Sequence, residues 1–390
     1  MSDLSIRQLQ EADFLEIPRF LIAYSFRTTP PLPSDEEWRK TLAYFDGAAS
    51  FVGFLDKQPV VHVAYGHMTQ NIRGKLYPCA GVWGVSTHPR ARRKGYAREV
   101  LLHTFAHMHK EGIPVSTLYA FRESFYQRLG YTTFPQSRQA RFATEGLLPL
   151  LKKELEGEVE LTDIKSGSQA FRAYLRQQQG RIHGMALFNE KLKEQAHAQN
   201  HSWLAIARVK GETKGMMLYG IKENQPMEVS QFYYDDSAGK YLLLEWLARH
   251  ADQITKIEMK VRPDEYPETW LADINVTTTS VEAPLGRVID VASLSGMQVG
   301  TGSFATRVVD PHCPWNEDCY RFESQDGLLQ VSRCAEADCT LSIQAISALI
   351  YGTHDPESFA IRGWGNPSAE LQSTLRSMFP PLLPYLYETF

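Results

Sequence analysis

The amino-acid sequence predicts a mixed α/β protein, with features of the α+β class, in which one plan occurs twice before a third region. The plan is an antiparallel meander followed by a helix and a further strand. Apolar runs alternate with short turns containing Asp, Asn, Gly, Lys and Pro in residues 50–86 and again in residues 202–234. A predicted helix and then another strand follow each meander. We therefore expect mixed, mostly antiparallel sheets flanked by helices.

The first meander comprises predicted strands at 50–55, 60–68 and 76–86, joined by turns at 56–59 and 71–74. Apolar residues then recur at helical spacing, at positions 97, 100, 101, 104, 105 and 108, and this pattern ends at Gly112 and Pro114. A strand is predicted over 115–120. A strand that leads through a helix into a neighbouring parallel strand forms a right-handed crossover.

A basic, glycine-containing loop connects the strand at 76–86 to this helix. Residues 88–95, which we call the basic loop, include Arg92, Arg93, Lys94 and Gly95. Backbone N–H groups at the start of a helix are unpaired, the helix dipole adds partial positive charge there, and Gly95 allows an anion to approach the backbone. The loop predicts a phosphate-binding site, and a solvated helix cap is the alternative. It is not a P-loop, because no Gly-Lys-Ser/Thr follows.

Two segments resemble those of the GNAT N-acetyltransferases. The spacing Arg92-x-x-Gly95-x-Ala97 is similar to the motif with which that family binds the pyrophosphate of acetyl-CoA. The segment 124–131 follows the next strand and resembles the family's short helix with a Phe-Tyr pair and a terminal glycine. The resemblance implies that Tyr126 protonates the departing CoA thiolate, as a phenol with a pKa of about 10 can do. A tyrosine half-buried in the core is the alternative.

The second copy of the plan has strands predicted at 202–209, 216–221 and 229–234, a helix at 241–250 and a strand at 254–261. Asp235 and Asp236 stand where the first copy has its basic loop, and two acids would repel a pyrophosphate. We expect a second GNAT-like fold without a cofactor site, serving as scaffold or substrate wall.

The third region has predicted strands at 304–309 and 320–324 and helices at 342–351 and 368–378. Residues 287–290 and 310–316 resemble the sterol-carrier-protein-like domain that ends the acetyltransferases of the "enhanced intracellular survival" type. We therefore expect a catalytic GNAT domain over 1–150, a second GNAT-like domain over 151–283 and a sterol-carrier-like domain over 284–390.

This resemblance implies the remaining site residues. The carboxylate of the last residue, Phe390, would act as general base on the substrate amine, and the apolar tail 385–390 argues that the chain end docks. Such a carboxylate needs burial or a water relay to act as a base. Gly95 alone is also compatible with a simple turn, and Arg98 with a solvated helix position. The cofactor-binding residues implied are Val85, Ser86, Thr87, Arg92, Arg93, Lys94, Gly95, Tyr96, Ala97, Arg98, Phe121 and Arg122.

The resemblance implies an acetyl-CoA-dependent N-acetyltransferase that acts on a primary amine of a small molecule, such as an aminoglycoside, or of a lysine side chain. It also implies a homo-oligomer, in that family a hexamer. A polycationic acceptor would favour a pocket lined by carboxylates, and Glu11, Asp13, Glu16, Asp35, Glu36 and Glu37 are available as either pocket or surface charges. A lipid-binding protein and a non-catalytic acyl-CoA sensor are the alternatives.

Length and composition set further bounds. The 390 residues are too many for one such domain, and 43% hydrophobic with 22% charged residues is typical of globular proteins. The net charge of −4 argues against nucleic acid as the main partner, and no apolar run suggests a membrane span or a leader, so we expect a cytoplasmic protein. No metal is expected. Four of the five cysteines are spaced too loosely for a zinc site, and His103 and His107 lack an apparent third ligand.

Overall fold

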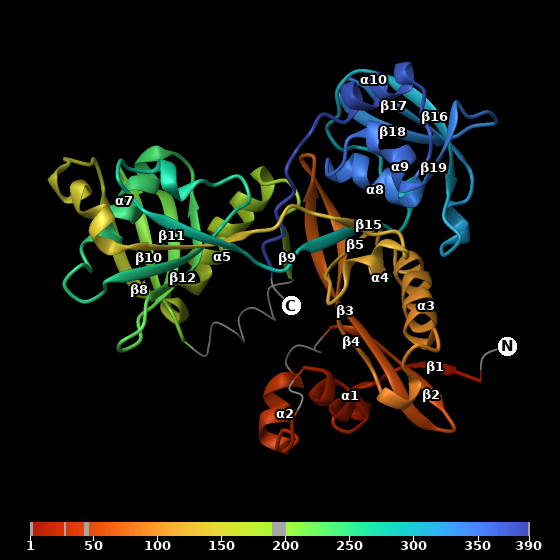
Figure 1. The fold of residues 1–390 in the computed structure, drawn as a ribbon, viewed down its shortest axis with the longest axis horizontal. Helices are drawn as coiled ribbons and strands as arrows, with labels where there is room; N and C mark the ends of the chain where they lie inside the picture. Colours follow the sequence, from red (N-terminus) through yellow and green to blue (C-terminus); the bar gives the residue numbers. More distant parts are fainter. Residues whose placement is uncertain (1–2, 27–28, 43–46, 189–199, 389–390) are drawn as a thin grey trace. The chain divides into compact units, whose positions relative to one another are not determined.

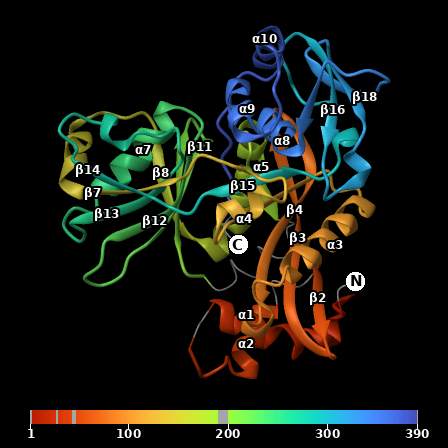
Figure 2. The same ribbon diagram turned by 45° about the vertical axis from the view of Figure 1, so that its right-hand side comes forward.

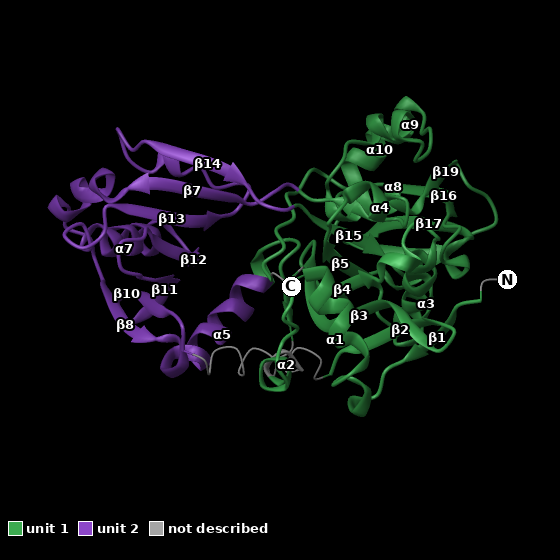
Figure 3. Cartoon of the chain, turned by 60° about the horizontal axis from the view of Figure 1, so that its bottom comes forward, with its two compact units in different colours: residues 1–134, 180–192, 283–390 green, residues 135–179, 193–282 purple. Residues whose placement is uncertain are grey.

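A computed structural model describes residues 3–26, 29–42, 47–188 and 200–388 of the chain (Figure 1). The chain divides into two compact units (Figure 3). Unit 1 contains residues 1–134, 180–192 and 283–390, and unit 2 contains residues 135–179 and 193–282. Within these units the mixed α/β and α+β architecture predicted from the sequence is confirmed.

The first sheet of unit 1 contains the predicted meander. Its strands are β1 (Ser5–Gln8), β2 (Ala49–Leu55), β3 (Gln58–Ile72), β4 (Lys75–Thr87), β5 (Val115–Tyr119), β15 (Pro284–Val288) and β6 (Thr132–Thr133), in that spatial order, with β9 (Ala186–Phe188) also paired to β3. β4 and β5 are parallel, and the other pairs are antiparallel.

Four helices accompany this sheet, namely α1 (Ile17–Phe26), α2 (Asp35–Leu42), α3 (Tyr96–Lys110) and α4 (Glu123–Gln127). α1 and α3 both pack against β3 and β4 (Figure 2). The apolar positions of α3 explain its packing, because Val100, Leu101, Phe105 and Met108 are all buried in the same core as Phe51 of β2. This packing fixes the start of α3 beside the end of β4.

The C-terminal part of unit 1 has its own four-stranded sheet, β18 (Leu328–Arg333), β17 (Cys319–Gln325), β16 (Ser303–Val309) and β19 (Cys339–Ser342). Its helices are α8 (Ile343–Tyr351), α9 (Phe359–Arg362) and α10 (Ala369–Met378). One hydrophobic core joins both sheets of unit 1, since Tyr77 and Phe134 pack in the same cluster as Phe304 and Tyr351.

Unit 2 contains the second meander. Its sheet has the order β14 (Val276–Ser280), β7 (Arg138–Ala143), β13 (Lys256–Val261), β12 (Met227–Tyr234), β11 (Glu212–Gly220), β10 (Trp203–Val209) and β8 (Glu158–Asp163). The helix α7 (Ser237–Ala248) connects β12 to the parallel strand β13, and α5 (Ile164–Arg181) follows β8. The leucines of α7 pack on the sheet in the core of this unit.

Each of the two GNAT-like sheets includes one strand that is far in the sequence from its own meander. β15, which follows the second meander, pairs with β5 in unit 1, whereas β7, which follows the first meander, pairs with β13 in unit 2. The sheets therefore include strands from both sides of the expected domain borders near residues 150 and 283, and those borders stay predictions.

Candidate active site

The parallel strands β4 and β5 separate at the point where a ligand site is predicted. They pair from Cys79↔Val115 to Gly81↔Thr117, and β4 then continues to Thr87. In this last part β4 contains a β-bulge, because Gly84 and Val85 together lie opposite the single residue Val63 of β3. Gly84 has φ +63°, a conformation that favours glycine. The bulge displaces Gly84 and Val85 from the regular ladder, and pairing resumes at Ser86↔His62 and Thr87↔Val61.

The basic loop has the geometry of an anion site. Arg93 has φ +61° and Gly95 has φ +87°, and a Cβ added at Gly95 would meet nothing within 4 Å. Gly95 is the N-cap of α3 and supplies no side chain to the helix start. The first backbone N–H groups of α3, at Tyr96, Ala97 and Arg98, therefore have no side-chain cap, and Gly95 before them is exposed.

The charges of the basic loop divide into two groups. Arg92 faces α1, since its Nε donates to the Thr87 carbonyl at 3.1 Å and its guanidinium lies 5.6 Å from the centre of the Tyr24 ring. Arg93 and Lys94 are exposed and have no ion-pair partner among the described residues. These two side chains are therefore available to a phosphate, whereas Arg92 is held against the protein.

The start of α7 in unit 2 is built in the opposite way. Asp236 is its N-cap, and its carboxylate accepts from the Gly239 N–H at 3.0 Å. The Asp235 carboxylate accepts from Tyr174 at 3.0 Å and from Gln178 at 2.6 Å. A Cβ at Gly239 would lie 2.1 Å from the Lys214 carbonyl oxygen, so this helix start is also closely packed. The donors that remain open in α3 are covered here by the protein's own carboxylate and backbone.

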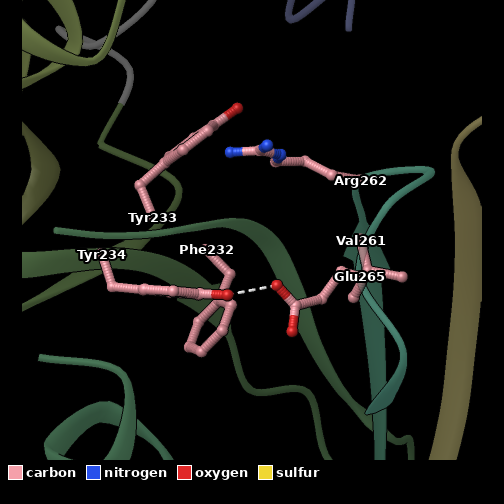
Figure 4. A pocket seen from close by; sticks show the side chains of 6 residues that line it. All are labelled: Phe232, Tyr233, Tyr234, Val261, Arg262 and Glu265. Atoms are coloured by element: carbon pink, nitrogen blue, oxygen red, sulfur yellow. Dashed lines mark hydrogen bonds between the residues drawn. The ribbon is translucent and has the colours of Figure 1, made fainter. Parts of the chain in front are cut away.

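A pocket in unit 2 lies where β12 and β13 separate, after their pairing from Met227↔Ile257 to Val229↔Met259 (Figure 4). The Tyr234 hydroxyl donates to the Glu265 carboxylate, which also accepts from Lys240 Nζ at 2.6 Å and from Trp270 Nε1 at 2.6 Å. The polar groups at this position satisfy one another, in contrast to the open basic loop of unit 1.

Tyr126 lies in α4, directly after the end of β5, and is 2% exposed. Its ring packs against Phe121, Phe125 and Tyr131, with centroid distances of 5.7, 5.0 and 5.8 Å. Burial, and secondarily Tyr131, raises the pKa of the Tyr126 phenol above its ordinary value. The phenol is therefore protonated at neutral pH. Its hydroxyl has no hydrogen-bond partner among the described residues and can donate. Phe121, which is 73% exposed, and the exposed Arg122 lie between the end of β5 and the start of α4.

The C-terminal tail docks in unit 1 beside β5, as its apolar sequence predicts. Tyr385, Leu386, Tyr387 and Glu388 are all buried. The hydroxyl of Tyr119, the last residue of β5, donates to the Leu386 carbonyl at 3.2 Å. Phe390, the predicted base, lies outside the described residues, and the structure follows the tail to Glu388, two residues before it.

The tail is anchored further upstream as well. Tyr385 N–H donates to the His183 carbonyl at 2.9 Å, and Arg73 at the β3–β4 turn donates to the Pro380 carbonyl at 3.0 Å. The same guanidinium donates to the Leu349 and Ile350 carbonyls at the end of α8. These contacts fix the path by which the chain reaches the end of β5. Sequence analysis did not single out Tyr119, Arg73 or His183, because no local pattern distinguishes them.

Three of the acidic residues that could line an acceptor pocket make contacts within the protein. Asp13 pairs with Arg7 at 2.7 Å and Asp35 with Arg19 at 2.5 Å. Glu37 accepts from Ser34 at the start of α2. These three acids therefore match the surface-charge alternative.

Among the residues that the structure describes, no group of three or more His, Cys, Asp or Glu side chains has a metal-binding arrangement. His107 bonds instead to Tyr65, with its Nδ1 2.8 Å from the hydroxyl oxygen, and packs edge-on against Phe51 together with His103. In this same described part of the chain, no helix is long and apolar enough to cross a membrane.

Comparisons with family models agree with this architecture. Residues 5–134 match a model described as an acetyltransferase (GNAT) domain, residues 183–288 match a second acetyltransferase (GNAT) model, and residues 291–387 match a sterol carrier protein domain. The chain thus contains acetyltransferase domains of the GNAT class. More particularly, it has the two-GNAT and sterol-carrier architecture that its sequence resembles.

Solved structures share the whole fold. A probable N-acyltransferase from Enterococcus faecalis V583 has a TM-score of 0.87 at 17% identity, with 99% of this chain and 100% of that chain covered. A GCN5-related N-acetyltransferase from Anabaena variabilis has a TM-score of 0.87 at 16% identity, with the same coverage. Eis1 from Mycobacterium abscessus has a TM-score of 0.78 at 16% identity, again over 99% and 100% of the chains. A search among curated proteins found no match.

Proposed function

We propose that the chain is an acetyl-CoA-dependent N-acetyltransferase whose reaction takes place in unit 1, where β4 and β5 separate. The observation that carries the proposal is the contrast between the two helix starts. In unit 1 the start of α3 keeps its N–H donors open beside the exposed Arg93 and Lys94, whereas in unit 2 Asp236 caps the start of α7. An uncapped, basic helix start is a site for a pyrophosphate.

The proposed reaction is a direct transfer of the acetyl group to a primary amine. The amine nitrogen attacks the thioester carbonyl, the new C–N bond forms and the C–S bond breaks. A backbone N–H at the β4 bulge, near Val85, would polarise the carbonyl oxygen. The Phe390 carboxylate would accept the proton lost by the amine, and the Tyr126 hydroxyl would give its proton to the departing thiolate. The position of Tyr126 directly after the end of β5, with its phenol kept protonated by burial, and the burial of the tail up to Glu388 support these roles.

The remaining parts of the proposal follow from the resemblance stated above. The acceptor would be an aminoglycoside, another small primary amine or a lysine side chain. The chain would act as a homo-oligomer, a hexamer, in the cytoplasm, with the catalytic domain over 1–150 and a second, cofactor-free domain over 151–283. The last domain, over 284–390, would carry the catalytic C-terminus.

Charge reversal at the basic loop tests the proposal. Replacing both Arg93 and Lys94 by Glu should raise the KM for acetyl-CoA at least tenfold, because two phosphate contacts of about 1 kcal/mol each become repulsive. Lys94→Glu alone can be compared with Lys57→Glu, which makes the same change of charge at an exposed turn of the same unit. KM is measured from CoA thiol release with a panel of primary amines.

The outcomes separate the alternatives. An unchanged KM in the double variant would contradict the pyrophosphate site, and a loss in Lys57→Glu equal to that in Lys94→Glu would indicate a general charge effect. Tight acetyl-CoA binding without thiol release for any amine would favour an acyl-CoA sensor. Sterol or fatty acid in an extract of the purified protein would favour a lipid-binding protein.

A further inference from the structure

Two polar side chains are buried beneath the β4 bulge. His62 of β3 and Ser50 of β2 are both 0% exposed. The Nδ1 atom of His62 lies 2.7 Å from the Gly84 carbonyl oxygen, and its Nε2 atom lies 2.8 Å from the Ser50 hydroxyl oxygen. The imidazole thus spans three adjacent strands of the sheet and ends on the first residue of the bulge.

The chemistry of these contacts fixes the protonation of the ring. A carbonyl oxygen can only accept, so Nδ1 carries the hydrogen and donates to Gly84. Burial lowers the pKa of His62 from 6.5 to about 4, so the ring is neutral at neutral pH. The neutral Nε2 is therefore an acceptor, and the Ser50 hydroxyl donates to it.

This arrangement determines the direction of the Gly84–Val85 peptide. The peptide is planar and trans, so the Val85 N–H points opposite to the Gly84 carbonyl. A bulge removes these residues from the regular ladder, and the strand partner no longer dictates that direction. Because His62 holds the carbonyl on its own side, the Val85 N–H is directed away from His62.

Glycine at position 84 makes the contact possible. A Cβ at this position would lie 3.0 Å from Cε1 of His62, and the φ of +63° is itself unfavourable for other residues. Both the close approach of the imidazole and the backbone conformation therefore favour glycine at position 84.

We infer that His62, oriented by Ser50, is a positioning residue that aims the Val85 N–H at the thioester carbonyl. The inference rests on the proposed function, since it assigns His62 a task in that same reaction. His62 does not touch the reacting atoms. It acts through the Gly84–Val85 peptide, so its loss should lower kcat and leave acetyl-CoA binding nearly unchanged.

The test uses two variants whose side-chain amide takes the place of one ring nitrogen each. In His62→Asn the side-chain NH2 can take the place of Nδ1–H and donate to Gly84. In His62→Gln the longer side chain reaches toward Ser50 and leaves Gly84 without its donor. Removing an oxyanion donor costs about 100- to 1,000-fold in kcat, so for a misaimed donor we expect a loss of about 10- to 100-fold in His62→Gln and of less than about tenfold in His62→Asn.

A spectroscopic readout distinguishes positioning from a general structural role. With acetyl-CoA labelled with 13C at the thioester carbonyl, binding to the native protein should move the carbonyl resonance downfield as the N–H polarises it. His62→Gln should lose most of this displacement at saturating acetyl-CoA, and His62→Asn should retain it. Equal kcat and equal displacement in all three proteins would overturn the inference, as would equal losses in the Asn and Gln variants.

A milder variant covers the case in which His62→Gln does not fold. Ser50→Ala removes the donor to Nε2 and loosens the ring, which at about 0.5–1.5 kcal/mol for one hydrogen bond corresponds to about a two- to twelvefold fall in kcat. An unchanged kcat and carbonyl resonance in folded Ser50→Ala would then refute the positioning role. The proposed function fails separately, if the native protein releases no CoA thiol with any amine.

Discussion

Mild acid should destabilise unit 1, because two of its histidines are buried in the neutral form. His62 is 0% and His183 is 6% exposed, and burial lowers the pKa of each from 6.5 to about 4. The His183 Nδ1 atom accepts from the Arg73 N–H at 3.0 Å, so its Nε2–H donates to the Tyr351 carbonyl at 3.0 Å. Both rings are therefore held in one neutral tautomer by the fold.

The sign and size of the effect follow from proton linkage. Between the folded pKa near 4 and the unfolded value of 6.5, the unfolded chain binds a proton that the folded chain does not. The free energy of unfolding therefore falls as the pH is lowered through this window. From pH 7 to pH 5 each histidine contributes a loss of about 2 kcal/mol, so the two together remove about 4 kcal/mol. Carboxylates with lowered pKa, such as Asp13, lose their contribution only near and below 3.8, outside this interval.

Urea denaturation at pH 7, 6 and 5 measures this dependence, with hydrogen–deuterium exchange of peptides from β3 and β4 to locate it in unit 1. His183→Gln keeps a donor for the Tyr351 carbonyl and has no group that titrates in this range. It should lower the free energy of unfolding at every pH but remove about half of the loss between pH 7 and pH 5. A native protein whose stability is flat over this range, or a variant with the full pH dependence, would refute the assignment of buried neutral imidazoles.

Three further outcomes are expected. Tyr126→Phe should lower turnover by about a hundredfold, with acetyl-CoA binding nearly intact, and normal turnover would leave Tyr126 with a structural role only. A few residues appended after Phe390 should remove most turnover, while an N-terminal tag should have no effect; full activity of the extended protein in the same thiol-release assay would exclude the terminal carboxylate as base. Asp310→Asn should lower the free energy of unfolding by about 3–5 kcal/mol in urea denaturation, because it leaves the Arg287 charge unpaired at 0% exposure. Replacing both residues by an apolar pair should recover most of that loss.

Local sequence chemistry predicted the meanders well, because their turns depend on a few residues. The turns expected at 71–74 and 210–213 contain Arg73 and Gly74, and Lys210 and Gly211, all with positive φ. Such turns join neighbouring antiparallel strands, so the strands on both sides followed directly from them. The helix predicted from the apolar spacing after Gly95 is α3, and it begins within one residue of the first apolar position, Ala97.

Long-range pairing could not be predicted in the same way. β7 has the sequence Arg-Gln-Ala-Arg-Phe-Ala and β8 has the sequence Glu-Val-Glu-Leu-Thr-Asp. Neither strand contains a clear apolar run. β15 pairs with β5 and β6, both more than a hundred residues earlier in the chain, and nothing local to residues 284–288 encodes that choice. These strands are determined by the cores that they complete.

The same limit applies to the site. The basic loop and Tyr126 could be proposed as site residues from the sequence because their chemistry is contained in short segments. His62 could not, because a histidine within an apolar strand has the same local pattern whether it fills space or bonds to a bulge. Its role depends on Gly84, which is more than twenty residues away along the chain and adjacent only after β3 and β4 pair.

The two helix starts also differ in what they contribute to stability, and this difference bears on which one binds a ligand. A side-chain cap such as that of Asp236 on α7 stabilises a helix by about 1 kcal/mol. The start of α3 has no such cap, and it includes Arg93 in a left-handed conformation that costs about 1–2 kcal/mol. Unit 1 therefore retains uncapped donors and backbone strain together at the start of α3. Such a combination is stable only if the surrounding core fixes it, and an anion that accepts from the open N–H groups would return the missing stabilisation on binding.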